Sequence, residues 1–296
     1  MKLFCIALLT LACFISCNKS DSPTPPAPPA ATDTTTLVKF VTIDSTQTAP
    51  FDTASICKFD YDNAKRVTKI SILAYNTVSR LLQTVVTLTY SYAGTDTLPY
   101  RYFEYNRPLN STFTLDWNHE LSYDAQGRMV RDSSNEVASA YTNVYTDKYI
   151  YTATQFTDSA FSYLPTTSAS GRKTFLTKDG SNNIIKQVPE NSTTATEIVY
   201  DNHLNPLYKT SVGYPYLMNS TYLCFFSGVN ITVQKNNFTK VSTNTYDAAG
   251  TTILNSYNKN FNITYKANGQ PSVIRIATTP TPVASDKYKY LFYYGI

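Results

Sequence analysis

A short turn motif recurs along most of this chain, with strictly alternating segments between its copies. Each copy starts with Tyr-Asp and reaches Gly or Asn a few residues later. Copies begin at Tyr61, Tyr123, Tyr200 and Tyr246, with a variant at Tyr265. Asp caps its own turn, and Gly or Asn accepts the positive φ that a tight hairpin needs. Because the segments between copies, such as Leu81–Tyr92, alternate with a period of two, the motif predicts antiparallel β-hairpins.

The spacing of the motif predicts the architecture. A second turn form, at 92–96 and 226–230, interleaves with the first, so the repeat period is about 25 residues, enough for two strands and two turns. Tyr is abundant, at 25 residues, and charged residues are only 16%, which favours strands over helices. We therefore expect an all-β domain over 37–296, with roughly eighteen strands in a long antiparallel meander. The meander curls into a single sheet, and a two-sheet sandwich is the alternative.

One copy of the motif resembles a known repeat. Residues 123–129 read Tyr-Asp-Ala-Gln-Gly-Arg-Met, which resembles the YD, or RHS-type, repeat, and drifted copies extend the resemblance over 55–277. In large RHS proteins such repeats form a shell around a toxin, but this chain is more similar to small YD-repeat lipoproteins of Bacteroidota. The resemblance implies a fold and an envelope location without an activity. It also raises an accessory role in an RHS-type toxin system.

The N-terminus predicts export and anchoring. Lys2 precedes an apolar run over 3–15, which is typical of a signal peptide and is shorter than the roughly 20 residues that span a bilayer. The run ends in Phe-Ile-Ser-Cys at 14–17 and resembles the bacterial lipobox, which implies cleavage after residue 16 and lipidation of Cys17. A secreted chain without lipid is the alternative. Residues 17–36 are rich in Pro and Thr and predict a tether of about 50 Å. We expect a lipid anchor in the outer membrane, on its periplasmic or cell-surface side.

No pattern predicts catalysis or a cofactor. The two histidines, His119 and His203, lack zinc spacing and are expected at the surface or in turns, so no metal site is expected. The chain contains no G-x-S-x-G motif, phosphate loop or dinucleotide fingerprint. The formal net charge of +4 is too weak and too scattered to predict a nucleic-acid partner. We therefore expect a non-catalytic protein.

The segment 116–120 is the densest polar cluster, and it suggests a glycan hydrolase as an alternative. Asp116 and Glu120 share a face of a regular strand but lie about 13 Å apart. Retaining glycosidases need about 5.5 Å between their carboxyl groups, and inverting ones about 6.5–9.5 Å. We therefore expect Trp117 and His119 to cover part of the core, while Asp116, Asn118 and Glu120 face water.

The abundance of Tyr suggests a binding surface. Aromatic faces on a rigid sheet bind sugar rings or peptide side chains. Tyr100 and Tyr102 with Glu104 form one candidate exposed row, and Tyr288 with Tyr290 forms another. With Trp117, Tyr100 and Tyr102 are the candidate ligand-binding residues for a glycan or an envelope protein. Most tyrosines, however, are expected in the core or in cross-strand pairs.

Two cysteines of the predicted domain raise the question of a disulfide. Cys57 and Cys224 lie in apolar strand contexts, near opposite ends of the repeat array. In an open meander they are too far apart to pair, so buried free thiols are expected. A sheet that closes on itself would bring Cys57 and Cys224 closer together and allow a disulfide, which an oxidising envelope permits.

Overall fold

The structure is a computed structural model in which the chain divides into Met1–Thr35 and Thr36–Ile296. It describes residues 36–48, 53–76, 79, 81–107, 115–137, 144–151, 155–164, 167–181, 183–206, 235–282, 286 and 288–295. All of these residues belong to the second unit.

The described residues form strands throughout. The strands are β1 (Thr36–Asp44), β2 (Thr53–Tyr61), β3 (Val67–Asn76), β4 (Leu81–Tyr92), β5 (Pro99–Asn106), β6 (Leu115–Tyr123), β7 (Met129–Glu136), β8 (Val144–Tyr151), β9 (Gln155–Leu164), β10 (Thr167–Lys178), β11 (Ile184–Pro189), β12 (Thr194–Leu204), β13 (Asn236–Tyr246), β14 (Ile253–Tyr265), β15 (Pro271–Thr279) and β16 (Tyr288–Gly295). The predicted roughly eighteen strands cover the whole domain, and the part that the structure describes contains sixteen.

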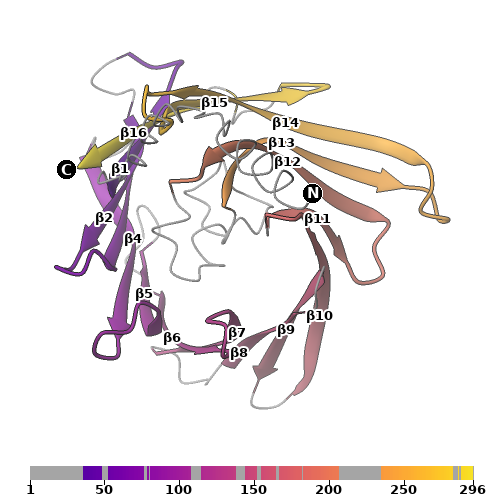
Figure 1. Cartoon of the computed structure of the whole chain (residues 1–296), viewed down its shortest axis with the longest axis horizontal. Coiled ribbons are helices and arrows are strands. Elements are labelled where there is room, and N and C mark those ends of the chain that lie inside the picture. Colours follow the sequence, from indigo (N-terminus) through magenta and orange to yellow (C-terminus); the bar gives the residue numbers. More distant parts are fainter. Residues whose placement is uncertain are drawn as a thin grey trace, which may run out of the picture. The chain divides into compact units, whose positions relative to one another are not determined.

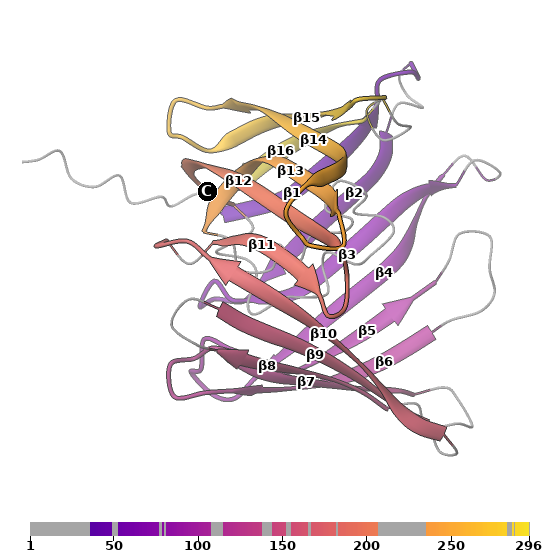
Figure 2. The same cartoon turned by 90° about the vertical axis from the view of Figure 1, so that its right-hand side faces the viewer.

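The strands form one antiparallel sheet in chain order. Each strand pairs with its neighbours in sequence, and β1 pairs with both β2 and β16, so the sheet closes on itself as a barrel (Figure 1). Seen from the side, the strands run obliquely between the two ends (Figure 2). The predicted all-β meander in a single sheet is confirmed, and the two-sheet sandwich is wrong. Closure follows because a twisted sheet of this width curls until its edges meet.

The Tyr-Asp corners are hairpin turns, as predicted. In the turn after β6, the Asp124 N–H donates to the Arg128 carbonyl at 2.9 Å, and the Gly127 N–H donates to the Asp124 carbonyl at 2.9 Å. The Asp124 carboxylate also accepts the backbone N–H groups of Gln126 and Arg128. The same bonds recur around Asp62, Asp179 and Asp247. The motif Asp therefore caps its turn from within.

The motif tyrosines tie neighbouring strand ends together. The hydroxyls of four of them, and that of Tyr294 on β16, donate to a carbonyl at the start of the preceding strand, whereas Tyr246 and Tyr265 donate to the carboxylates of Glu197 and Asp201. The pairs are Tyr61 to Leu37, Tyr92 to Val67, Tyr123 to Pro99, Tyr200 to Ile184 and Tyr294 to Pro271, at 2.6–3.0 Å. Their rings pack against the hydrophobic core, and burial raises the pKa of Tyr92 to about 12. The Tyr of the motif thus closes the hairpin that precedes its turn.

The corner expected at Tyr200 is wrong. Strand β12 continues to Leu204, with register shifts between Tyr200 and Leu204 where a turn was predicted. The Asp201 carboxylate accepts the His203 N–H at 2.9 Å and a hydrogen bond from the Tyr265 hydroxyl of β14. The motif Asp is therefore used across the sheet.

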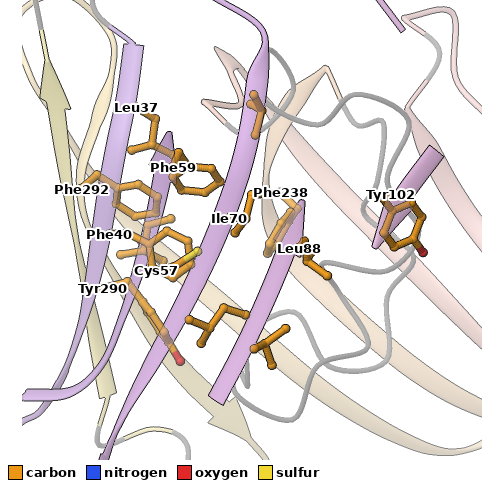
Figure 3. Packing of buried hydrophobic residues seen from close by; sticks show 14 of the residues in the cluster. Leu37, Phe40, Cys57, Phe59, Ile70, Leu88, Tyr102, Phe238, Tyr290 and Phe292 are labelled. Carbon is orange, nitrogen blue, oxygen red and sulfur yellow. The ribbon is translucent and has the colours of Figure 1, made fainter. Parts of the chain in front are cut away.

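The two faces of the sheet differ. Register partners Phe59, Ile70 and Leu88 are at most 4% exposed, whereas their neighbours Lys58 and Lys69 are exposed. A closed single sheet encloses only one of its faces, so the buried face is the inner face. Figure 3 shows core side chains from β1, β2 and β16, including Phe40, whose ring centroid lies 5.8 Å from that of Phe292.

Replacing Gly127 with alanine is expected to destabilise the barrel. Its φ is +73°, a left-handed conformation that costs a residue with a Cβ about 1–2 kcal/mol. We expect the free energy of unfolding in urea to fall by about 1 kcal/mol. Gly180 is the matched control, because its φ is not in this region and nothing lies within 4 Å of a Cβ added there. An equal loss in Gly180→Ala would contradict the turn argument.

Candidate functional site

The inner face changes from apolar to polar between β4 and β6. One row of register partners runs from Leu88 to Glu104 to Trp117, and the next runs from Tyr90 to Tyr102 to His119. Trp117 is half-buried and the others are at most 6% exposed. A buried ionisable group needs hydrogen-bond or charged partners. The candidate site is therefore sought among the buried polar side chains of this part of the wall.

Three ionisable side chains meet there, on three neighbouring strands. Glu104 of β5, His119 of β6 and Asp132 of β7 are 1%, 3% and 5% exposed, and we call them the carboxylate–imidazole cluster. His119 Nδ1 lies 3.0 Å from Asp132 Oδ1, and His119 Nε2 lies 3.7 Å from Glu104 Oε2. The Tyr102 hydroxyl donates to Asp132 Oδ2 at 3.3 Å, and its ring stacks on His119 at 3.9 Å between centroids.

The two carboxyl groups of the cluster are in different environments. Burial raises the pKa of Glu104 to about 7, with a further increase from the negative charge of Asp132. The Asn106 side-chain amide donates to Glu104 Oε1 and opposes this increase. Near neutral pH, Glu104 therefore exchanges a proton inside the wall, while Asp132 accepts hydrogen bonds from Tyr102 and faces Nδ1 of His119.

The cluster is arranged like an acid–base site, but all three of its side chains are buried. Asp132 orients the imidazole, and Glu104 faces its other nitrogen, as in many acid–base sites. A general acid or base must reach the reacting atom within hydrogen-bond distance. With exposures of at most 5%, none of the three side chains reaches a molecule outside the wall. The cluster is therefore a polar part of the core.

The predicted ligand-binding residues differ in exposure. Tyr100 is 47% exposed, but Tyr102 and Glu104 are 1% exposed, so the expected exposed row is wrong. Tyr290 of the second row is also 1% exposed. The register of β4 against β5 turns Tyr102 toward Tyr90, whose ring centroid lies 5.8 Å away.

The alternation over 116–120 agrees with the core interpretation. His119 is buried and Trp117 is half-buried, whereas the Glu120 side chain is 65% exposed and its carboxylate lies 3.6 Å from Arg101. A surface position for His119 is therefore wrong, because its register partner Tyr102 belongs to the inner face. The side chain of Asp116 lies outside the described ones.

The outer face carries charged side chains around the circumference, with exposed apolar ones such as Ile150, Phe175 and Val199 among them. Following the register from strand to strand, the side chains that share a face with Lys58 include a charged residue on most strands. They are Lys39, Lys58, Asp60, Lys69, Arg101, Glu120, Arg131, Lys148, Lys173, Lys186, Glu197, Lys240, Arg275 and Lys289. Lys148, Lys173, Lys240 and Arg275 lie near the middle of their strands. Basic side chains dominate this face.

Two further observations bear on the sequence predictions. Cys57 is a buried free thiol, and burial raises its pKa. Cys17 and Cys224 lie outside the described residues. Within the part of the chain that the structure describes, no group of three or more His, Cys, Asp or Glu side chains is arranged to hold a metal ion. The same part contains no helix long and apolar enough to cross a membrane.

Comparison with known proteins finds the fold but no family. No protein-family model matches, and no curated protein matches in sequence. A crystal structure of a porin-like protein from Bacteroides vulgatus is 12% identical with a TM-score of 0.50, covering 88% of this chain and 99% of that one. A porin-like protein from Bacteroides uniformis is 12% identical with a TM-score of 0.51, covering 88% of this chain and 96% of the other. The chain therefore has the fold of these porin-like proteins.

Proposed function

We propose that this protein is a lipid-anchored protein of the outer membrane whose barrel stands in water and acts as a non-catalytic binding or structural module. The observation that carries the proposal is the charged outer face. Membrane barrels have an apolar outer band and a polar interior. The barrel described above has its hydrophobic core on the inner face and charged side chains near the middle of several strands on the outer face.

The energetic cost of placing this face in lipid is large. A Lys or Arg on the lipid face costs about 2–4 kcal/mol at the bilayer midplane. Lys148, Lys173, Lys240 and Arg275 lie at mid-strand, and together they would cost roughly 8–16 kcal/mol there. That is comparable to the whole stability of a domain. A barrel in water avoids this cost.

The envelope location is supported by two independent lines. The lipobox-like residues 14–17 and the Pro/Thr-rich segment over 17–36 are what an exported, tethered lipoprotein needs. The proteins of similar fold come from Bacteroides and are described as porin-like, which supports association with the outer membrane. The two sides of that membrane remain alternatives.

The non-catalytic interpretation is supported by the closed cluster. Glu104, His119 and Asp132 are sealed in the wall, so the side chains best suited to acid–base chemistry do not meet a substrate. An exposed polar face on a rigid barrel suits a glycan or another envelope protein as the partner. The glycan hydrolase and the accessory of an RHS-type toxin system stay predictions without an observation in their favour.

The Cys17→Ser variant tests the proposal directly. Without the thiol no lipid is attached, and we expect the exported protein to move almost completely from the membrane fraction to the soluble fraction without detergent. Labelling with radioactive palmitate is expected for the wild type and absent in the variant. Cys57→Ser is the matched control, and it should leave both partition and labelling unchanged.

Two outcomes would contradict the proposal. A Cys17→Ser variant that stays in the membrane and needs detergent for release would mean that the barrel itself is embedded. Reproducible turnover of a glycan by the purified protein would overturn the non-catalytic interpretation. Binding on a glycan array, or a defined partner recovered from envelope extract, is the supporting result.

A further inference from the structure

Pairs of like charge lie directly opposite each other on the outer face. The register sets Lys39 against Lys58, Arg131 against Lys148, and Arg275 against Lys289. Like charges directly opposite on neighbouring strands destabilise a sheet. All three pairs are cationic, and the opposed pairs Asp60–Lys69, Arg101–Glu120 and Lys186–Glu197 on the same face are of opposite charge. Where these like charges meet on the face, they are therefore positive.

Two of these pairs lie on one side of the barrel, where the sheet closes. Strands β15, β16, β1 and β2 are consecutive neighbours, and Lys69 on β3 extends the group. We call Lys39, Lys58, Lys69, Arg275 and Lys289 the seam patch. Lys58, Lys69 and Arg275 are exposed and the other two are half-buried.

The charge of the seam patch is not neutralised within the barrel. The ion pairs among the described residues involve none of its five cations. Asp60 is opposite Lys69 in the register, so the local balance stays strongly positive. Lys39 Nζ lies 4.7 Å from the centre of the Tyr293 ring, and that ring is 42% exposed. An aromatic ring among exposed cations suits a surface that is partly apolar and negatively charged.

The patch begins on the strand that the tether enters. Lys39 is the fourth residue of β1, which begins at Thr36, and the tether predicted over 17–36 ends there. A tether of about 50 Å is long enough to let this side of the barrel reach the membrane surface. Tethering at such a distance raises the effective concentration of the surface to a level at which weak attraction is sufficient.

We propose that the seam patch docks the barrel onto the phosphate-bearing headgroups of the membrane that carries its anchor. The patch meets the phosphates with its five cations, and Tyr293 lies at the headgroup level. This inference rests on the proposed lipid anchor. It gives the barrel one preferred side toward the membrane and leaves the opposite wall, with β7 and β8 (Figure 1), facing away.

Vesicle binding tests the docking surface. The chain from residue 17 onward, carrying Cys17→Ser, is sedimented with vesicles of phosphatidylglycerol and phosphatidylcholine, or of phosphatidylcholine alone. We expect binding only to the anionic vesicles, with loss at high salt because surface charges are screened. The double variant Arg275→Gln/Lys289→Gln should bind roughly thirty-fold more weakly.

The matched control removes the same two residue types elsewhere on the wall. Arg131→Gln/Lys148→Gln also separates an opposed Arg–Lys pair, and it should bind anionic vesicles within about twofold of the parent. Equal loss in both double variants would overturn the proposal, because attraction would then follow net charge alone. Binding to an acidic polysaccharide but not to anionic vesicles would also overturn it, in favour of a glycan partner. Since the assay uses unlipidated protein, its failure would leave the palmitate labelling of Cys17 unaffected.

Discussion

Replacing Asp132 with alanine is expected to lower the free energy of unfolding by about 2–6 kcal/mol, because it removes the buried hydrogen-bond partner of two side chains at about 1–3 kcal/mol each. Asp132 accepts from the Tyr102 hydroxyl at 3.3 Å and lies 3.0 Å from His119 Nδ1. Its loss removes the acceptor of both groups inside a wall that water does not reach. Urea unfolding followed by the fluorescence of Trp117, the single tryptophan of the chain, measures the change.

Two comparisons separate the network from a general effect of removing a carboxylate. Asp60→Ala removes an exposed Asp from the same sheet and should change stability by no more than about 0.5 kcal/mol. Asp132→Ala and His119→Ala should together cost less than the sum of the two single changes, by about 0.5–3 kcal/mol. Strict additivity would show that the two side chains do not act as a unit.

The local elements of this fold can be predicted from the sequence, because the turn motif carries its own chemistry. An Asp that caps its turn and a Gly at positive φ need no distant partner, so the corners at 62–66 and 124–128 follow from a few residues each. The predicted corner at Tyr200 is wrong because its Asp has a distant partner. Asp201 bonds to Tyr265, a residue 64 positions away, and no local pattern indicates that bond.

Only part of the carboxylate–imidazole cluster can be predicted from the sequence. Once the turn at 124–128 fixes the register, Leu121 pairs with Asp132, which places Asp132 on the face of His119. The burial of Asp132 can therefore be predicted from the sequence. The burial of Glu104 cannot be predicted in this way, because the sequence between β5 and β6, at 107–114, contains no turn motif that would give the register of the two strands. Alternation predicts an exposed row at Tyr100 and Tyr102 wrongly, because it identifies two faces of a strand without showing which face the barrel encloses.

The fold of this barrel resembles that of porin-like proteins, but our proposal about its environment rests on its surface. Likeness at 12% identity to porin-like proteins establishes how strands are connected. Whether a barrel lies in lipid or in water depends on which face is apolar. Here the apolar side chains Phe40, Ile72 and Leu88 are enclosed, while Lys148 and Arg275 are exposed. These surface charges support the proposal that this barrel stands in water.

The stability of the barrel is expected to depend on pH through Glu104. Burial raises the pKa of Glu104 from 4.5 to about 7. Between these values the unfolded chain releases this proton while the folded chain keeps it, so stability falls as pH rises through that window. Below pH 4.5 both states are protonated, and above pH 7 the folded barrel contains a buried carboxylate. The shift corresponds to about 3 kcal/mol.

Glu104→Gln should therefore remove this pH dependence and stabilise the barrel at pH 8 by about 3 kcal/mol, with little effect at pH 4.5. The amide keeps an oxygen for the Asn106 donor and carries no charge. Glu197→Gln is a control of opposite sign, because hydrogen bonds from Tyr246 and Lys186 lower the pKa of Glu197, so its loss should destabilise the barrel at pH 8. Urea unfolding across this pH range measures both. If Glu104→Gln were destabilising at pH 8, the charged carboxylate would instead hold the network together, and the wall would be built around an ionised Glu104.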